Sequence, residues 1–283
     1  MIVVTGASGH LGRLVIDALI TTVDPGEVVA GVRTPDKVAD LAERGVVARR
    51  LDYDQPDTVR AALAGADKLL LISGSEVGRR VPQHQAVIDA AVAEGVSLLA
   101  YTSILRCDTT PLLLAAEHRA TEQAITRSGL PATLLRHGWY TENYTESLAQ
   151  ALEQGTFVGS AGAGRIAAAT RADFAAADAA VLTGSGHEGA VYELGGEAFT
   201  MADLAAAVSA EVGRTIGYTD LPPADYRAAL VQAGMPEPYA DVLVDADVNI
   251  AQGHLDASPS PLASLLGRPP TPLVYALRAA VTN

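Results

Sequence analysis

The sequence predicts an α/β fold in which helices cover both faces of a parallel sheet, followed by a smaller lobe. Three observations lead to this prediction. An apolar strand at the N-terminus runs into a glycine-rich turn and an amphipathic helix. Strand-like and helical stretches then alternate up to about residue 137. The expected strands are also apolar at nearly every position, as in a parallel sheet that is covered on both faces.

Apolar stretches between turn residues mark the strands of the first half, and helical spacing marks the segments between them. After the first strand, which ends at Thr5, strands are expected at residues 27–32, 46–51, 68–73, 96–103 and 132–136. Helices are expected at about 13–22, 36–44, 56–64, 80–94 and 112–129. This alternation, with right-handed crossovers, gives a Rossmann-type, doubly wound sheet.

The alternation changes after Gly138, where helices predominate. Helices are expected at about 140–154, 172–184, 200–211, 223–233 and 237–251. Short strands are expected at 164–169, 190–194 and 216–219. We therefore divide the chain into a sheet domain, residues 1–137, and a smaller α+β lobe, residues 138–283, which is partly interleaved with the sheet and lies over its carboxyl edge.

Composition argues against several classes of protein. The chain has 20 Lys and Arg against 33 Asp and Glu, a formal net charge of −13, whereas a nucleic-acid partner demands a basic face. Cys107 is the only cysteine and the six histidines are scattered, so we expect neither a disulfide nor a metal site. The N-terminus lacks a signal-peptide pattern and no run of 18 apolar residues occurs. These features favour a cytoplasmic protein without a membrane span.

The glycine-rich turn after the first strand has the pattern G-x-x-G-x-x-G. Such a turn lets the backbone approach a pyrophosphate closely, and the N-terminus of the following helix holds the negative charge. A tight turn without a ligand is the alternative, and the place of the turn in an alternating pattern favours a dinucleotide. The residues expected to contact the cofactor here are Gly6, Ser8, Gly9, His10, Leu11 and Gly12.

The end of the second strand indicates which dinucleotide is bound. NAD-binding proteins usually place an Asp or Glu about 20 residues past the glycines, where it holds the ribose 2′-hydroxyl. Here Arg33 stands in that place, and an arginine suits a 2′-phosphate. A solvated surface arginine is the alternative. We expect the cofactor to be NADP(H), bound by the domain of residues 1–137.

The ends of the other strands should complete the cofactor site, because ligands of open α/β sheets lie beyond the carboxyl ends of the strands. Asp52 is expected to accept the adenine amine, or else to cap the next turn. Small residues after the fourth strand let the backbone lie along the ribose, and the nicotinamide should reach the end of the fifth strand. The cofactor-binding residues expected at these ends are Asp52, Tyr53, Ser73, Gly74, Ser75, Thr102, His137 and Gly138.

Aromatic and amide side chains gather after the sixth strand. Trp139, Tyr140, Asn143 and Tyr144 follow it, although only 5% of the chain is aromatic and it has a single tryptophan. A buried aromatic plug is one interpretation. The other interpretation, a platform for a flat ring substrate, makes the more specific prediction about function.

Several segments together resemble the atypical short-chain dehydrogenase/reductases of the NmrA-like group, above all the type 2 class of NADPH-dependent quinone oxidoreductases, with triphenylmethane reductase as a near relative. The glycine spacing is that of the short-chain superfamily, and Gly138–Tyr144 is the most specific segment. The resemblance extends over essentially the whole chain, and its carriers are residues 3–9, 32–37, 101–105, 117–122, 134–144 and 234–239.

The chain departs from the wider superfamily where a helix usually carries Tyr-x-x-x-Lys. Leu114 and His118 stand at those places, so no phenol is available to protonate a substrate alkoxide. Alcohol dehydrogenation, sugar epimerisation and isoflavonoid-type chemistry are therefore disfavoured. Quinone reduction demands less of the protein, because binding and orientation can supply most of the rate.

The resemblance implies a reductase that transfers hydride from NADPH to quinones or similar conjugated acceptors. Tyr101, Ser103, Trp139 and Asn143 are expected to donate hydrogen bonds or position the ring, and His118 to contact the nicotinamide ribose in place of the lysine. The alternative is a non-catalytic NADP(H)-ratio sensor of the NmrA type that acts through a protein partner. The partners implied are a small aromatic or quinone substrate and, as an open possibility, a second copy of the chain in a homodimer.

Overall fold

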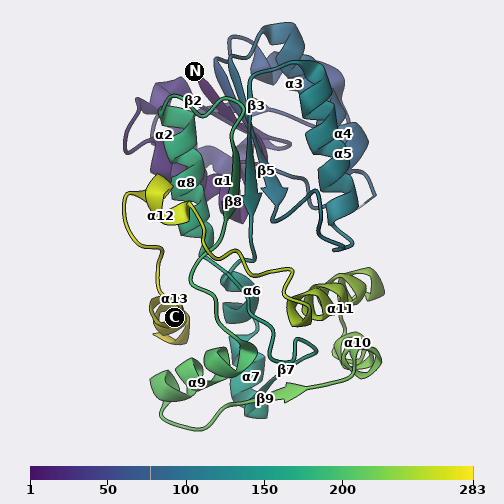
Figure 1. Cartoon of the computed structure of the whole chain (residues 1–283). Helices are drawn as coiled ribbons and strands as arrows, with labels where there is room; N and C mark the ends of the chain where they lie inside the picture. Colours follow the sequence, from purple (N-terminus) through teal and green to yellow (C-terminus); the bar gives the residue numbers. More distant parts are fainter. Residues whose placement is uncertain (77, 283) are drawn as a thin grey trace.

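A seven-stranded parallel sheet forms the centre of the computed structural model, which describes residues 1–76 and 78–282 (Figure 1). Its strands lie in the order β3-β2-β1-β4-β5-β6-β8. Their bounds are β1 Ile2–Val4, β2 Val28–Val32, β3 Val47–Arg50, β4 Lys68–Leu71, β5 Leu98–Ile104, β6 Ala132–His137 and β8 Val191–Leu194. The order reverses between β1 and β4, so a crevice opens at the carboxyl ends of these two strands.

The register of the strands explains why they are apolar at successive positions. One row of paired residues faces one helical layer and the next row faces the other, since side chains alternate along a strand. The first row consists of Val29, Val3, Leu69 and Leu99. The second consists of Ala30, Val4, Leu70 and Ala100. Both rows are fully buried, which confirms the doubly wound prediction.

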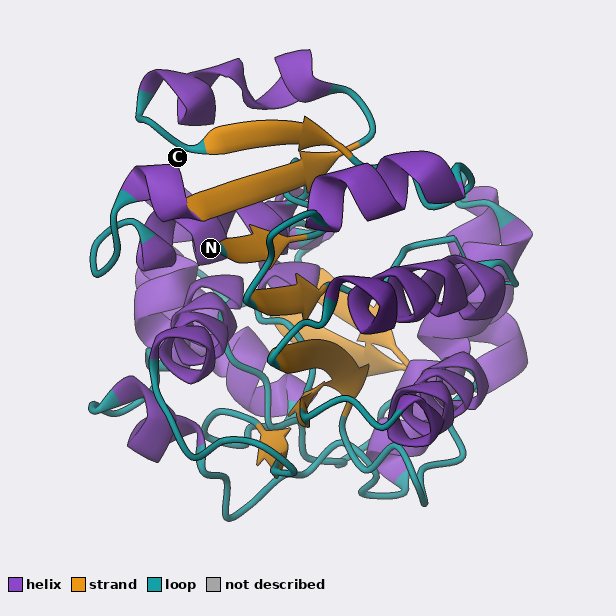
Figure 2. Ribbon diagram, turned by 90° about the horizontal axis from the view of Figure 1, so that it is seen from above, coloured by secondary structure: helices purple, strands orange, loops and turns teal. Residues whose placement is uncertain are grey.

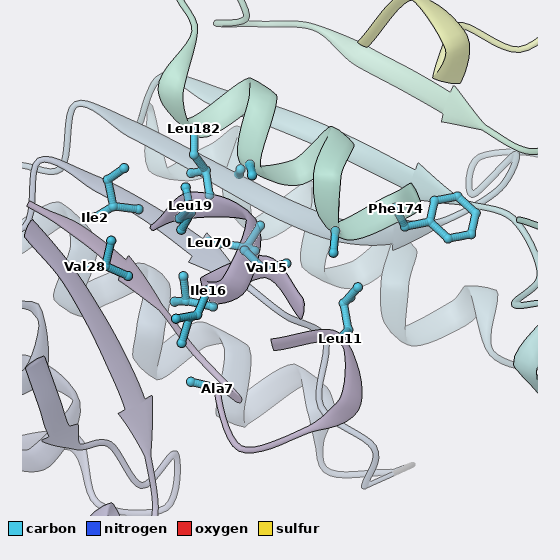
Figure 3. Close-up of a cluster of buried hydrophobic side chains, with 14 of the residues drawn as sticks. Ile2, Ala7, Leu11, Val15, Ile16, Leu19, Val28, Leu70, Phe174 and Leu182 are labelled. Atoms are coloured by element: carbon cyan, nitrogen blue, oxygen red, sulfur yellow. The ribbon is translucent and has the colours of Figure 1, made fainter. Parts of the chain in front are cut away.

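Helices cover both faces of the sheet, as Figure 2 shows. On one face lie α3 (Pro56–Leu63), α4 (Arg80–Glu94) and α5 (Ala115–Ser128). On the other lie α1 (His10–Leu19), α2 (Ala39–Glu43), α8 (Arg171–Thr183) and α12 (Leu262–Leu266). Figure 3 shows Leu11, Val15 and Leu19 of α1 beside the side chains of Phe174 and Leu182 on α8. Thus α8 and β8, from the second half of the sequence, complete the layers of the first half.

The remaining elements form a lobe beyond the end toward which β5 points (Figure 1). Its helices are α6 (Glu142–Thr145), α7 (Leu148–Gln154), α9 (Met201–Val212), α10 (Pro223–Gln232), α11 (Glu237–Ala251) and α13 (Leu273–Thr282). A small parallel sheet joins β7 (Thr156–Gly159) to β9 (Gly217–Asp220). The lobe has a hydrophobic core of its own. Within residues 1–76 and 78–282, no helix is both long and apolar enough to cross a membrane.

The structure corrects several predicted elements. The strand expected at 164–169 is wrong, because this segment forms only isolated bridges, Ile166 to Phe199 and Ala169 to Tyr140. Its small apolar residues match the pattern of a buried strand, but they are buried as a connection between sheet and lobe. The helix expected at 140–154 is two helices, α6 and α7, and strand β7 was not predicted. A short apolar stretch alone does not distinguish these outcomes.

Candidate functional site

A cavity of about 740 Å³ lies at the carboxyl ends of β1 to β4, and we call it the switch-point cavity. Four loops line it, each following one of these strands. Most of the residues predicted to bind the cofactor line this cavity: Gly6, Ser8, Gly9, His10, Leu11, Gly12, Arg33, Asp52, Tyr53, Ser73, Gly74 and Ser75. Residues from four separate strand ends therefore share one cavity.

The glycine turn presents bare backbone to the switch-point cavity. Gly6 has φ +59°, a left-handed conformation that favours glycine. Gly9 precedes α1 as its N-cap, and no side chain caps the helix. The first amides of α1 thus have no partner inside the helix and suit a pyrophosphate. A Cβ on Gly12 would lie 2.5 Å from the Gly6 carbonyl oxygen, so this glycine lets the helix pack against the turn.

Two cations lie in the wall formed by the loop after β2. Arg33 is predominantly exposed, 71% for its side chain, and its Nη1 lies 3.3 Å from Glu76 Oε1. Lys37, four residues on, lines the same cavity. Sequence reasoning did not include Lys37 among the site residues, although it belongs to the same loop. Together the two cations can neutralise a 2′-phosphate, which would compete with Glu76 for Arg33.

Asp52 and Tyr53 line the cavity and are also bonded to the protein. Asp52 accepts the Asp54 amide and the Gln55 side-chain amide, both at 3.2 Å, so its carboxylate caps the turn before α3. The Tyr53 hydroxyl donates to the Ile72 carbonyl at 3.3 Å. Burial raises the pKa of Tyr53 to about 12, which keeps this phenol protonated as a donor.

His84 anchors the loop after β4. The Gly74 amide donates to His84 Nε2 at 3.0 Å, so this nitrogen carries no proton. The proton is on Nδ1, which lies 2.9 Å from the Thr121 hydroxyl. Burial lowers the pKa of His84 to about 4, in agreement with a neutral ring. Arg80 Nε holds the other side of the loop by donating to the Gly74 carbonyl at 2.5 Å.

No motif predicted this anchoring, although His84 and Arg80 lie only ten and six residues after Gly74. Arg80 and Gln83 nonetheless line the switch-point cavity beside the predicted loop.

Three predicted cofactor residues lie behind the wall of the cavity. The Thr102 hydroxyl accepts the Ser73 amide at 2.9 Å and so supports the loop. His137 is buried, with Nε2 2.9 Å from Asp178 Oδ1. A Cβ on Gly138 would lie 3.0 Å from two carbonyl oxygens, so this glycine is required by backbone packing. None of the three is among the residues that line the cavity.

Three further predicted site residues, Tyr101, Ser103 and His118, are also buried. None of them lines the switch-point cavity or the larger cavity in the lobe. The Tyr101 hydroxyl lies 2.8 Å from His118 Nδ1, and burial lowers the pKa of His118 to about 3. The Ser103 hydroxyl donates to Glu122 Oε1 at 2.5 Å, and Glu122 is also paired with Arg136 at 2.7 Å. These hydroxyls therefore have partners inside the protein.

A second cavity, of about 1000 Å³, lies between α6, α7, β7, α10 and α11, and we call it the lobe cavity. Trp139 and Asn143 line it, whereas Tyr140, between them in sequence, lines the switch-point cavity. The segment 139–143 therefore contributes to the lining of both cavities. Backbone bonds secure it, since Thr141 donates to the Ala169 carbonyl at 2.9 Å.

Arg171, which sequence reasoning missed, orients this segment. Its guanidinium carbon lies 4.9 Å from the centre of the Tyr140 ring, within the range of a cation–π contact. Its Nη2 donates to Asn143 Oδ1 at 3.4 Å. Because a guanidinium only donates, the amide oxygen of Asn143 must face it. The Asn143 NH₂ group is left as a donor on the lobe cavity.

Comparison with known proteins agrees with this geometry. A family model described as NAD(P)H-binding matches residues 6–185. The chain belongs to this NAD(P)H-binding family. The matched residues include the glycine turn and the loops that line the switch-point cavity.

Curated relatives and solved structures match nearly the whole chain. Quinone oxidoreductase 2 of Escherichia coli is 50% identical over 274 residues, which are 96% of each chain. The crystal structure of an E. coli NADPH-dependent quinone oxidoreductase complexed with NADPH has a TM-score of 0.97 and 49% identity, and the match covers 100% of both chains. The Citrobacter triphenylmethane reductase complexed with NADP(H) has a TM-score of 0.95 and 35% identity, covering 99% of this chain and 100% of that one.

Proposed function

We propose that the protein is an NADPH-dependent reductase of quinones or similar conjugated acceptors. The observation that carries the proposal is the segment 139–143, which contributes side chains both to a dinucleotide-sized crevice and to a separate cavity of about 1000 Å³. A cofactor in the first space and an aromatic acceptor in the second would meet at this segment. The 50% identity to a quinone oxidoreductase over 96% of the chain supports this class of acceptor.

The residues of the switch-point cavity fit NADP(H). The free amides at the start of α1 and the bare turn at Gly9 hold the pyrophosphate. Arg33 and Lys37 hold the 2′-phosphate and select NADPH over NADH. The loop at Gly74, anchored by His84, positions the ribose. When bound, the reduced nicotinamide supplies a hydride, which carries both electrons of the reaction.

The residues of the lobe cavity orient the acceptor. Trp139 provides a flat surface for an aromatic ring. Asn143 donates a hydrogen bond to the acceptor oxygen, which becomes negatively charged as the ring is reduced. The quinone gains the hydride and one proton from water, so NADPH, quinone and a proton yield NADP⁺ and hydroquinone. Tyr101, Ser103 and His118 support the end of β5 behind this site as positioning residues.

The experiment is steady-state NADPH oxidation by the purified protein with a panel of benzoquinones and naphthoquinones. We expect turnover without bound flavin, and a primary isotope effect with NADPH deuterated on one C4 face if chemistry limits the rate. Tight NADP(H) binding without turnover on any acceptor would overturn the proposal in favour of the sensor function.

Location and assembly stay predictions. We propose that the protein is cytoplasmic and does not bind nucleic acid. We also propose that it assembles as a homodimer. Cell fractionation checks the first, and light scattering coupled to gel filtration checks the second.

A further inference from the structure

The lobe cavity contains one charged side chain among the described residues that line it, Asp247 of α11. Its surroundings are largely apolar and aromatic. Asp247 Oδ2 accepts the Ser160 amide at 2.7 Å. In the described part of the chain, no Lys, Arg or His lies within ion-pair distance of this carboxylate. A carboxylate without a cationic partner on a largely apolar cavity is costly, so this site suits a ligand that brings a positive charge or a hydrogen-bond donor.

A second group in the same cavity lacks a partner. The Tyr144 side chain is only 9% exposed, and its hydroxyl has no hydrogen-bond partner in the described part of the chain. Tyr144 and Tyr226 both line the cavity, and the charge of Asp247 contributes to raising the pKa of both hydroxyls. A buried hydroxyl without a bond costs stability unless a ligand or water satisfies it.

The other ionisable groups that face Asp247 add no positive charge. Asp220 accepts the Tyr218 hydroxyl at 2.8 Å and the Gly162 amide at 2.9 Å. Burial raises the pKa of Tyr144, Tyr218 and Tyr226 above that of free tyrosine, so these phenols stay neutral. The local field in this part of the cavity is therefore negative.

We propose that Asp247 selects acceptors by charge: the lobe cavity prefers aromatic acceptors that carry an ammonium or other hydrogen-bond-donating substituent, and disfavours those that carry an anionic group. This inference rests on the proposed function, because it assigns the class of acceptor to the same cavity. An ammonium group would pair with the free oxygen of Asp247, whereas a sulfonate would face a carboxylate in a poorly solvated space.

A binding experiment tests this inference without turnover, because Trp139 lines the lobe cavity and is the only tryptophan of the chain. Its fluorescence is titrated with three small aromatic probes: benzylammonium, methyl phenyl sulfone and benzenesulfonate. We expect the cation to bind about tenfold more tightly than the neutral sulfone, the size of one charge-assisted contact, and the anion to bind more weakly than the sulfone.

The variant Asp247→Asn keeps an oxygen for the Ser160 amide and removes the charge. We expect it to bring the affinities of the cation and the sulfone to within about twofold, since the charge-assisted contact is lost. Asp241→Asn is the matched control, because Asp241 lies on the same helix and is paired with Arg227 at 2.6 Å outside the cavity. It should retain the wild-type ratio.

Acidification provides a second test on the unaltered chain. Burial raises the pKa of Asp247 to about 6, so the preference for the cation should be full at pH 8 and largely lost at about pH 5, where the carboxyl is protonated. Equal affinities for the three probes at pH 8, or a wild-type ratio in Asp247→Asn, would overturn the inference. Either result leaves the proposed function standing if neutral quinones are reduced, and that function fails separately if none is.

Discussion

At the scale of single residues, cofactor choice depends on the two cations after β2. Arg33→Asp should weaken NADPH binding by about tenfold to a hundredfold and leave NADH binding nearly unchanged, because one charge-assisted contact to the 2′-phosphate is lost. Lys37→Ala should weaken NADPH binding further in the double variant. Titration of both cofactors measures the effect, and Arg44→Asp, which alters a surface pair with Asp17, is the control. Equal losses for NADPH and NADH would show that Arg33 does not contact the 2′-phosphate.

Asn143 carries the second prediction at this scale. Asn143→Leu preserves the size of the side chain but removes the donor that Arg171 orients toward the lobe cavity. We expect kcat with a simple quinone to fall by about tenfold to a hundredfold, with NADPH affinity unchanged, because the bond strengthens as charge develops on the acceptor. Steady-state kinetics and a cofactor titration separate the two quantities. A higher KM with unchanged kcat would instead mean that Asn143 contributes only to acceptor binding.

At the scale of elements, two variants of the turn between β1 and α1 should distinguish an effect on cofactor binding from an effect on folding. A Cβ on Gly9 would lie 3.2 Å from the Gly6 carbonyl oxygen, a tight contact that a shift of a few tenths of an ångström relieves, and Gly9 has φ −79°. Gly9→Ala should therefore fold with a smaller loss of Tm than a variant at Gly12. It should still weaken NADPH binding, because the methyl group occupies the pyrophosphate approach.

Gly12→Ala is the contrasting variant of the same turn. Its Cβ would lie 2.5 Å from the Gly6 oxygen and 2.7 Å from the Ala7 Cα, so α1 must shift away from the turn that precedes it. We expect a loss of about 2 kcal/mol in the free energy of unfolding, as for other overpacked sites. Thermal unfolding of both variants measures the contrast. A wild-type Tm for Gly12→Ala would contradict the packing role.

At the scale of the whole molecule, buried neutral histidines make stability depend on pH. Burial lowers the pKa of His84 to about 4 in the folded chain, from about 6.5 for a free histidine. Above pH 6.5 neither state gains a proton at this site. Between pH 6.5 and 4 the unfolded chain is protonated and the folded chain is not, so the free energy of unfolding falls as the pH falls, by up to about 3 kcal/mol.

His84→Gln retains an acceptor for the Gly74 amide and removes this titration. The variant should therefore lose less stability than the wild type between pH 7.5 and 5, with a difference of about 2 kcal/mol. Urea unfolding at the two pH values measures it, and His254→Gln, at a partly exposed histidine, is the control. The same pH dependence in His84→Gln and the wild type would show that folding does not lower the pKa of His84.

The sequence by itself determined the doubly wound sheet and most of the cofactor cavity. Both follow from local patterns, since apolar strands, helical spacing and the glycine turn at Gly6 to Gly12 act within one βα unit at a time. The chain order of such units then brings the carboxyl ends of the strands to one edge. Arg33, Asp52 and Ser73 could be placed on that edge for this reason.

The tertiary structure alone decided which side chains reach a cavity. Tyr101 and Ser103 lie at the end of an expected strand and His118 on the helix that follows, yet packing buries them between α4, α5 and their own strand. Strand β7, the anchoring of Gly74 by His84, the orientation of Asn143 by Arg171 and the lone carboxylate of Asp247 also became visible only in the fold. Each depends on how elements pack against one another, and a local pattern carries no information about such packing.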